Sequence, residues 1–306
     1  MNSLVYWIGF AAVIIIMLAL DLGVFNRKAH TIKPKEALLT SLLWIGISLA
    51  FNAFVFYTQG SEKGLEFLAG YLIEKSLSVD NIFVFVVIFS YFDTASKLQH
   101  KVLFWGIIGA LVMRGILIAV GSALIHQFEW IVYIFGAFLI YTAFKLAMQS
   151  ETGVHPEQNP VVNLFRRVMP VAKDYDGSNF FTRVNGKLMA TPLIIVLIIV
   201  ETTDLVFALD SIPAIFAVTT DPFIVYTSNV FAILGLRALY FLLAGAIGSF
   251  RYLKIGLSLV LGFVGIKMII AAIDIEIPIA ISLGVIALIL TVSIVASIIV
   301  NRRDEK

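Results

Sequence analysis

The sequence predicts an all-α protein that crosses a membrane many times. Of its 306 residues, 60% are hydrophobic, whereas soluble domains contain about 45–50% even when glycine is counted. Several apolar runs reach about 20 residues, the length that a helix needs to cross a hydrocarbon core about 30 Å thick. Both observations argue against an ordinary soluble fold.

Cysteine content and net charge further narrow the kinds of site and partner that the protein can have. The chain has no cysteine, which excludes disulfides, thiolate metal sites and cysteine nucleophiles. The net charge of +2, with basic residues spread over short loops, gives no reason to expect a nucleic-acid partner. The N-terminal run lacks a basic region and a small-residue cleavage site, so we expect an uncleaved first span.

Nine transmembrane helices follow from the apolar runs. In chain order they cover about residues 4–25, 37–57, 66–90, 101–125, 128–149, 190–217, 224–248, 252–272 and 277–300. The loops alternate between basic segments, such as 26–35 and 250–254, and segments that are not basic. Because basic loops tend to stay in the cytoplasm, the alternation predicts an N-terminus outside and a C-terminus in the cytoplasm.

Charged residues inside the spans recur in the same order in the two halves. An aspartate, an arginine and a lysine return after 122 to 124 residues: Asp80, Arg114 and Lys145 are followed by Asp204, Arg237 and Lys267. Each unit, spans 3–5 and spans 6–8, contains three helices, so the second unit would enter the bilayer from the opposite side. Such an inverted 3+3 repeat is typical of transporters.

The repeat divides the chain into five parts. They are two N-terminal helices in 1–65, a first three-helix repeat in 66–149, a cytoplasmic connecting loop in 150–189, a second three-helix repeat in 190–272, and a last helix with a cytoplasmic tail in 273–306.

Ionisable side chains inside a bilayer are costly, so they face a bundle interior or a water-filled cavity and usually have partners. By depth, we expect Asp80 to pair with Arg114 and Asp204 with Arg237. These could be static packing pairs or part of an ion path. Three further acids have no arginine at matching depth and suit an exchange of protons for a cation: Glu74, Glu201 and Asp210.

Helical geometry groups these oxygens. At about 100° per residue, Glu201 and Asp204 share a face of span 6. In span 3, Glu74, Ser78 and Asn81 form an oxygen-bearing stripe. Two helices would thus offer hard oxygen ligands at similar depth.

Asp210 should point elsewhere on a regular helix, unless Pro213 interrupts it. Proline cannot donate to the carbonyl of Leu209 and disfavours helical geometry just before it. A break at this point would free carbonyls beside Asp210, as in the ion sites of secondary transporters. An ordinary proline kink is the alternative.

The ligand types favour hard or borderline divalent cations such as Mn²⁺, Mg²⁺ or Ca²⁺. Zinc, copper and nickel are less favoured, because the four histidines lie in loops or at span ends: His30, His100, His126 and His155.

Three stretches resemble the TerC family of membrane proteins, close to its Alx-like branch. They are "IEKSLSVDNIFVF", "DYDGSNFFTRVNGK" and the long run that begins "TPLIIVLIIVETTDLVFALDSIP". The resemblance implies a bacterial inner-membrane protein associated with manganese export and with metal or tellurium stress, related to LysE-type exporters. Its acidic motifs fall on Glu74, Asp80, Asn81, Glu201, Asp204, Asp210 and Ser211.

Residues and resemblance together predict an exporter of a divalent cation, with Mn²⁺ favoured, that works by alternating access. The ion, a transported substrate rather than a prosthetic group, would bind between spans 3 and 6. Proton coupling is a further hypothesis. Charge compensation is assigned to Arg114, Arg237, Lys145 and Lys267.

Other functions stay open at this stage. The chain could export an amino acid or another small solute, or it could be a metallation or scaffold partner for secreted proteins that docks through 150–189. An intramembrane aspartyl protease is disfavoured, because neither Asp80 nor Asp204 follows a Gly-x-Gly sequence. We therefore expect no enzyme, and the expected partners are a divalent ion and the lipid bilayer.

Overall fold

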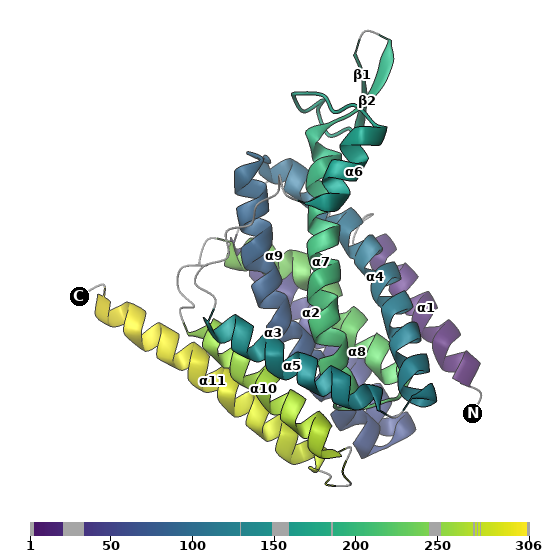
Figure 1. The fold of residues 1–306 in the computed structure, drawn as a ribbon, viewed down its shortest axis with the longest axis vertical. Coiled ribbons are helices and arrows are strands. Elements are labelled where there is room, and N and C mark those ends of the chain that lie inside the picture. Colours follow the sequence, from purple (N-terminus) through teal and green to yellow (C-terminus); the bar gives the residue numbers. More distant parts are fainter. Residues whose placement is uncertain are drawn as a thin grey trace.

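Helices form almost all of the structure, a computed structural model that describes residues 3–20, 34–128, 130–148, 159–184, 186–244, 252–271, 273, 275 and 277–304. Each predicted span coincides with one helix or, in one case, with two. These are α1 (Ser3–Leu20), α2 (Pro34–Gln59), α3 (Ser61–Tyr91), α4 (Ser96–Gln127), α5 (Ile131–Met148), α7 (Pro192–Phe216), α8 (Pro222–Leu234) with α9 (Leu236–Leu243), α10 (Leu253–Ala271) and α11 (Ile279–Asp304) (Figure 1). The prediction of an all-α polytopic membrane protein is confirmed.

Seven spans among the described residues are long and apolar enough to cross a membrane, with α8 and α9 counted together. The α1 helix adds a shorter apolar stretch, Leu4–Ala19. The α3 helix is 31 residues long, which gives it a length of about 46 Å. It also carries charged residues along its interior, and these belong to the site described below.

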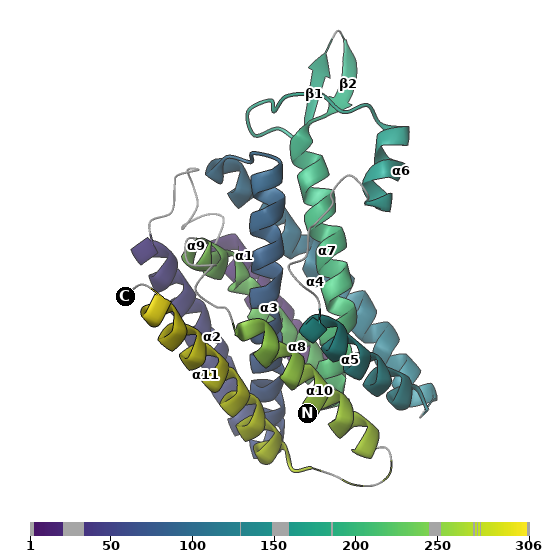
Figure 2. The ribbon, with the colours of Figure 1, turned by 60° about the vertical axis from the view of Figure 1, so that its left-hand side comes forward.

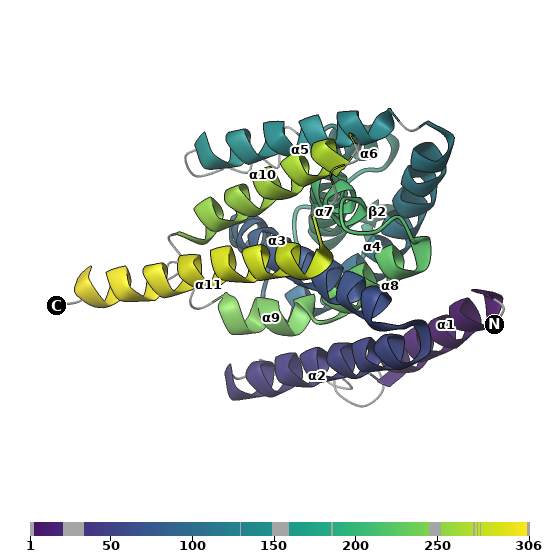
Figure 3. The ribbon, with the colours of Figure 1, turned by 90° about the horizontal axis from the view of Figure 1, so that it is seen from below.

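Four helices form the centre of the bundle. The α3 helix packs against α7 and α8, and α4 packs against the same two helices. Around them, α5 lies beside α10, α10 contacts α11, and α2 covers α3 and α9 (Figure 3). Exchange of the two predicted halves would produce the same pairings, α3 with α8 and α7 with α4. The inverted repeat itself stays a prediction.

The helix break expected near Pro213 is wrong, because α7 continues through Pro213 to Phe216. Pro213 lies in the last turn of α7, so the one bond that it cannot make, to the carbonyl of Leu209, does not interrupt the helix. The carbonyls around it are satisfied by the chain that follows: the amide of Ala217 donates to Pro213 O at 3.0 Å, and that of Val218 to Ile215 O at 2.9 Å. The proline therefore ends the helix without opening it at Asp210.

A break does occur in the next span, at Gly235 between α8 and α9. Lys75 of α3 donates from Nζ to the carbonyl of Ala232 at 3.2 Å. A Cβ on residue 235 would lie 2.7 Å from Lys75 Nζ and 3.2 Å from the Cβ of Trp44. A side chain at residue 235 would therefore displace the end of the Lys75 side chain and crowd Trp44.

The segment before α7 folds into a small module at one end of the bundle. It contains α6 (Pro160–Val168) and an antiparallel hairpin of β1 (Phe181–Val184) and β2 (Lys187–Ala190) (Figures 1 and 2). We call this the hairpin end. Tyr175 attaches the module to the α3–α4 turn by donating to Phe92 O at 2.9 Å. Burial raises the pKa of the Tyr175 hydroxyl, which keeps it protonated as a donor.

Candidate ion-binding site

A buried arginine joins the central helices. The Arg114 side chain from α4 is 1% exposed, and its Nη1 contacts Glu74 of α3. Asp204 of α7 accepts from Nη2 at 3.0 Å and from Nε at 3.2 Å, a bidentate arrangement. Such charge-assisted forks are strong and geometrically specific. Arg114 therefore binds one carboxylate from each half of the chain.

Neutral side chains complete the coordination of these charges. Asn229 of α8 accepts from Arg114 Nη1 at 3.2 Å and donates to the second oxygen of Glu74 at 2.9 Å. Ser211 Oγ lies 3.4 Å from the same Nη1, and Asn81 Nδ2 donates to Asp204 Oδ1 at 3.3 Å. We name this group the Arg114 cluster: Glu74, Asn81, Arg114, Asp204, Ser211 and Asn229.

The cluster corrects two predicted pairings. Asp204 binds Arg114 and not Arg237, and Glu74, expected to lack an arginine, has one. The reason is the packing of α4 against α7, which brings the acidic face of α7 to Arg114 and not to an arginine of its own half. Asp80 lies in α3, but its side chain is outside the described residues, so its pairing stays a prediction.

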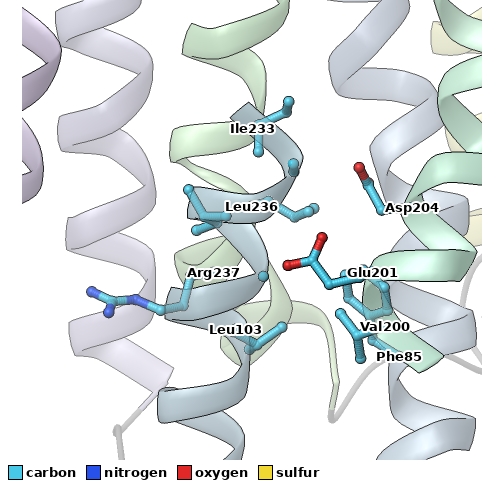
Figure 4. A pocket seen from close by; sticks show the side chains of 11 residues that line it. Phe85, Leu103, Val200, Glu201, Asp204, Ile233, Leu236 and Arg237 are labelled. Carbon is cyan, nitrogen blue, oxygen red and sulfur yellow. The ribbon is translucent and has the colours of Figure 1, made fainter. Parts of the chain in front are cut away.

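Glu201 lies beside the cluster, one helical turn from Asp204 as its spacing predicts. Both residues line a small cavity of ≈ 20 Å³, enough for about one water molecule. Its other walls are mostly apolar and include Phe85, Leu103, Gly106, Ile107, Ala110, Val200, Ile233 and Leu236. Figure 4 shows the Glu201 carboxylate pointing into the cavity and the Arg237 guanidinium pointing away from it.

The Glu201 carboxylate also rests against α4 at Gly109. A Cβ built on Gly109 would collide with it, whereas one on Gly106 would lie 3.4 Å from Val200, an ordinary contact. The absence of a side chain at residue 109 therefore makes the room in which Glu201 sits.

Three buried oxygens near the cluster have no hydrogen-bond partner among the described residues. They are Ser78 Oγ, Asn81 Oδ1 and Glu201 Oε2. Buried polar atoms are nearly always paired, and an exception calls for an explanation such as a bound ion or water. Ser78 and Asn81 lie on the α3 stripe predicted together with Glu74.

The remaining predicted residues lie elsewhere. Asp210 is half-buried and accepts from Thr142 of α5 at 3.1 Å, near the positive charge of Lys145, which is itself exposed. Lys267 is buried and interacts electrostatically with Glu66, near the end of the bundle opposite the hairpin. The structure thus assembles Glu74, Asn81, Glu201, Asp204 and Ser211, but not Asp210, in one place.

No three histidine, aspartate or glutamate side chains in the described part of the chain form a ready metal site. Arg114 holds the two carboxylates that a divalent ion would need. In this conformation Arg114, a cation of the protein itself, is therefore paired with both carboxylates.

Asn229 is the member that sequence reasoning missed. It follows Thr227 and Ser228 within an apolar span, so a polar run was visible there. The predicted site takes its oxygen-bearing side chains from spans 3 and 6 alone, whereas Asn229 lies in span 7. A search for amide side chains in the spans would have found it.

A bundle of apolar helices around a buried, charged cluster defines a polytopic integral membrane protein. The family described as "Integral membrane protein TerC family" matches residues 59–305. An uncharacterized membrane protein of Myxococcus xanthus is 57% identical over 97% of this chain and 92% of its own length. Alx of Escherichia coli K12, named as a proposed membrane-bound redox modulator, is 51% identical over 98% and 96%.

The chain belongs to the TerC family. An Alx of Photorhabdus laumondii is 46% identical over 99% of this chain and 98% of its own length. No solved structure matches the chain.

Proposed function

We propose that the protein is a transporter that exports a divalent metal cation, with Mn²⁺ as the first candidate, by alternating access. The observation that carries the proposal is the Arg114 cluster, in which carboxylates from both halves meet a single guanidinium inside the membrane. A static packing role would be satisfied by one acid. Two acids on one arginine leave a surplus negative charge that a cation can neutralise.

In this proposal the guanidinium of Arg114 binds the carboxylates of the site while no transported ion is bound. Glu201 receives the cation first, because its carboxylate lines the cavity and has an unpartnered oxygen among the described residues. Movement of Arg114 would then release Asp204 and Glu74. Asn81 Oδ1 and Ser78 Oγ add neutral oxygens, and oxygen ligands of this kind suit Mn²⁺ and Mg²⁺.

The direction of transport follows from the same geometry and the basic loops. The cavity lies on the side of Asp204 nearer the hairpin end, and the connecting loop there is rich in lysine and arginine. We assign that end to the cytoplasm of a bacterial inner membrane, with the N-terminus outside. The surplus acids also support an exchange for protons. Asp80 and Asp210 remain candidate ligands from the family's motif in another conformation.

The size of the cavity favours an ion over a larger solute. A space of ≈ 20 Å³ holds about one water, so an amino acid would need a much larger opening between the helices. The redox role in the name of the relatives fits the same proposal. Without cysteine the chain has no thiol to exchange, and an effect on redox balance would come from the metal it moves.

Mn²⁺ flux in proteoliposomes tests the proposal. Wild type is compared with Asp204→Asn, Asp80→Asn and Arg237→Met at two external pH values, with the folded fraction of each measured by size exclusion. We expect flux to be lost in Asp204→Asn and to depend on the pH gradient in wild type. Full flux in folded Asp204→Asn and Asp80→Asn would make both aspartates structural and would overturn the site.

A deletion in the module at the hairpin end distinguishes transport from a metallation or scaffold role. Deletion of β1 and β2 should leave flux nearly unchanged if transport is the function. Unchanged flux with the loss of a bound secreted protein would instead favour a scaffold.

A further inference from the structure

The α6 helix lies along the first half of α7 and is not a free linker. Asn159, the N-cap of α6, donates to Thr202 Oγ1 of α7 at 2.7 Å. After α6, the amide of Ala172 donates to Ala190 O at 2.8 Å, just before α7 begins. Since Thr202 is ten residues into α7, α6 covers about 15 Å of that helix (Figure 2).

One face of α6 packs inward and another stays open. Val162 is 1% exposed and packs in the hydrophobic cluster that contains residues of α3, α4 and α7. On the outer face, Val161, Leu164 and Val168 are 44%, 62% and 80% exposed. These three residues project within about 60° of one another on a helix of 3.6 residues per turn. The outer face of α6 is thus a continuous apolar stripe.

The stripe continues an exposed apolar face of α7, a helix long and apolar enough to cross a membrane. Thr202, Val206 and Leu209 share one face of α7, because they are four and three residues apart. Val206 is 60% exposed and Leu209 48% exposed on this membrane-crossing helix. The Asn159–Thr202 bond therefore places the start of α6 one turn from the lipid-covered part of α7.

The other end of α6 is basic. Arg166 and Arg167 occupy its last turn, towards the hairpin end, and both are exposed. A guanidinium can extend to the headgroup region while its aliphatic stem lies on apolar surface, and its fork matches phosphate oxygens. The apolar stripe at membrane depth and the arginines at its edge together match the composition of an interfacial helix.

We propose that α6 is a lipid-contacting helix that lies against α7 at the edge of the membrane-crossing bundle. Its outer face inserts among lipid chains, and Arg166 and Arg167 bind the phosphates of anionic phospholipids. The bilayer, and not a soluble protein, is then the partner of this part of the connecting segment. The inference does not depend on the transported substrate.

The absence of cysteine allows a direct test. Val168→Cys introduces a single thiol on the stripe, and Asn163→Cys introduces one on the opposite face of the same helix as a matched control. Each full-length variant is labelled with an environment-sensitive fluorophore and reconstituted in phosphatidylcholine vesicles with or without phosphatidylglycerol. Lipids carrying a nitroxide on the acyl chain serve as quenchers.

We expect the label on residue 168 to be blue-shifted and quenched by the acyl-chain nitroxide, more so with phosphatidylglycerol, and the label on residue 163 to stay in water. Adding Arg166→Gln and Arg167→Gln should lower the ratio of lipid-exposed to water-exposed label about fivefold per arginine in anionic vesicles, and little in neutral ones. Leu164→Cys provides a second position if Val168→Cys fails to fold.

Either of two results would overturn the proposal. One is a label on residues 164 and 168 that remains in water in anionic vesicles. The other is protection that arises only when a soluble protein fraction is added, which would make the stripe a protein-docking surface.

Discussion

Two aspartates six residues apart on α7 have very different surroundings. Asp204 is 4% exposed and accepts from Nη2 and Nε of Arg114 and from Asn81. Asp210 is half-buried and accepts one bond, from the hydroxyl of Thr142. The resemblance in sequence includes both acids among the motif residues, but helical periodicity already places Asp210 on another face than Asp204.

The difference shows that the face of a helix, more than its charge content, decides which acids act together. Asp204 faces α3 and α4, which supply the amide of Asn81 and the guanidinium of Arg114 as partners. Asp210 faces α5, where a threonine and an exposed lysine are its neighbours. We therefore assign substrate binding to the Asp204 side of α7 and a lesser role to Asp210 in this conformation.

The largest effect is expected at Arg114. Arg114→Leu leaves Glu74 and Asp204 buried without a cation, and breaking a buried pair in this way costs about 3–5 kcal/mol. Thr142→Val removes the hydrogen bond that Asp210 accepts from the Thr142 hydroxyl and should cost about 1 kcal/mol. Thermal unfolding in detergent measures both. Adding Glu74→Gln and Asp204→Asn to Arg114→Leu should recover part of the loss, and equal stability of both single variants would refute the comparison.

The two aspartates should also differ in how much their replacement lowers Mn²⁺ flux. Asp204→Asn should lower Mn²⁺ flux by about tenfold or more, because hydrogen bonds to charged groups are worth roughly 1.5–3 kcal/mol. Asp210→Asn should keep flux within about threefold, since its interactions are fewer and more exposed. Flux is measured in proteoliposomes at equal folded protein. A greater loss in Asp210→Asn would place the ion path on the α5 side of α7.

Replacement of Asn229 should have a smaller effect than replacement of Arg114 or Glu74, the two charged residues that it bridges. Asn229→Leu keeps a similar size but removes both hydrogen bonds, to Arg114 and to Glu74, and should cost about 1–3 kcal/mol. The expected result is a lower unfolding temperature with altered flux. Ser228→Ala, at a neighbouring residue bonded only to its own helix, is the control. Matching behaviour of the two variants would remove Asn229 from the cluster.

The smallest effect is expected in the wall of the cavity. Gly109→Ala places a methyl group where the Glu201 carboxylate lies, so that side chain must move. We expect the apparent KM for Mn²⁺ to rise by about threefold to tenfold, since a displacement of this kind is worth roughly 1 kcal/mol. Gly262→Ala, whose added methyl would make an ordinary contact with Ala143 away from the cavity, should leave KM unchanged. An equal rise in both variants would show that Glu201 is not the group affected.

Most of the fold could be predicted because lipid imposes a simple rule on each span. Apolar runs such as 277–300 have no alternative to a helix in a bilayer. Every predicted span coincides with one helix or, for 224–248, with the two helices α8 and α9. The connecting segment was harder. The α6 helix is stabilised by its contacts with α7, and no run of nine residues such as Pro160–Val168 can show that partner from sequence alone.

The site was predictable as a set of residues but not as a set of pairs. Periodicity grouped Glu74 with Asn81 and Glu201 with Asp204, and the structure confirms both groups. Pairing by depth failed at Arg114, because depth along a span says nothing about which helices are neighbours. The same limit applies to the interruption at Gly235, where Lys75 meets the carbonyl of Ala232, because these residues are 157 positions apart in the chain.

The shared guanidinium has a consequence for how the chain is made. Glu74 precedes Arg114 by 40 residues, so α3 and α4 can leave the insertion machinery as a helical hairpin whose opposite charges already neutralise each other. Asp204 follows Arg114 by 90 residues and reaches the lipid after a cationic partner is in place. The order of synthesis thus allows Arg114 to neutralise first Glu74 and then Asp204 as the chain enters the membrane.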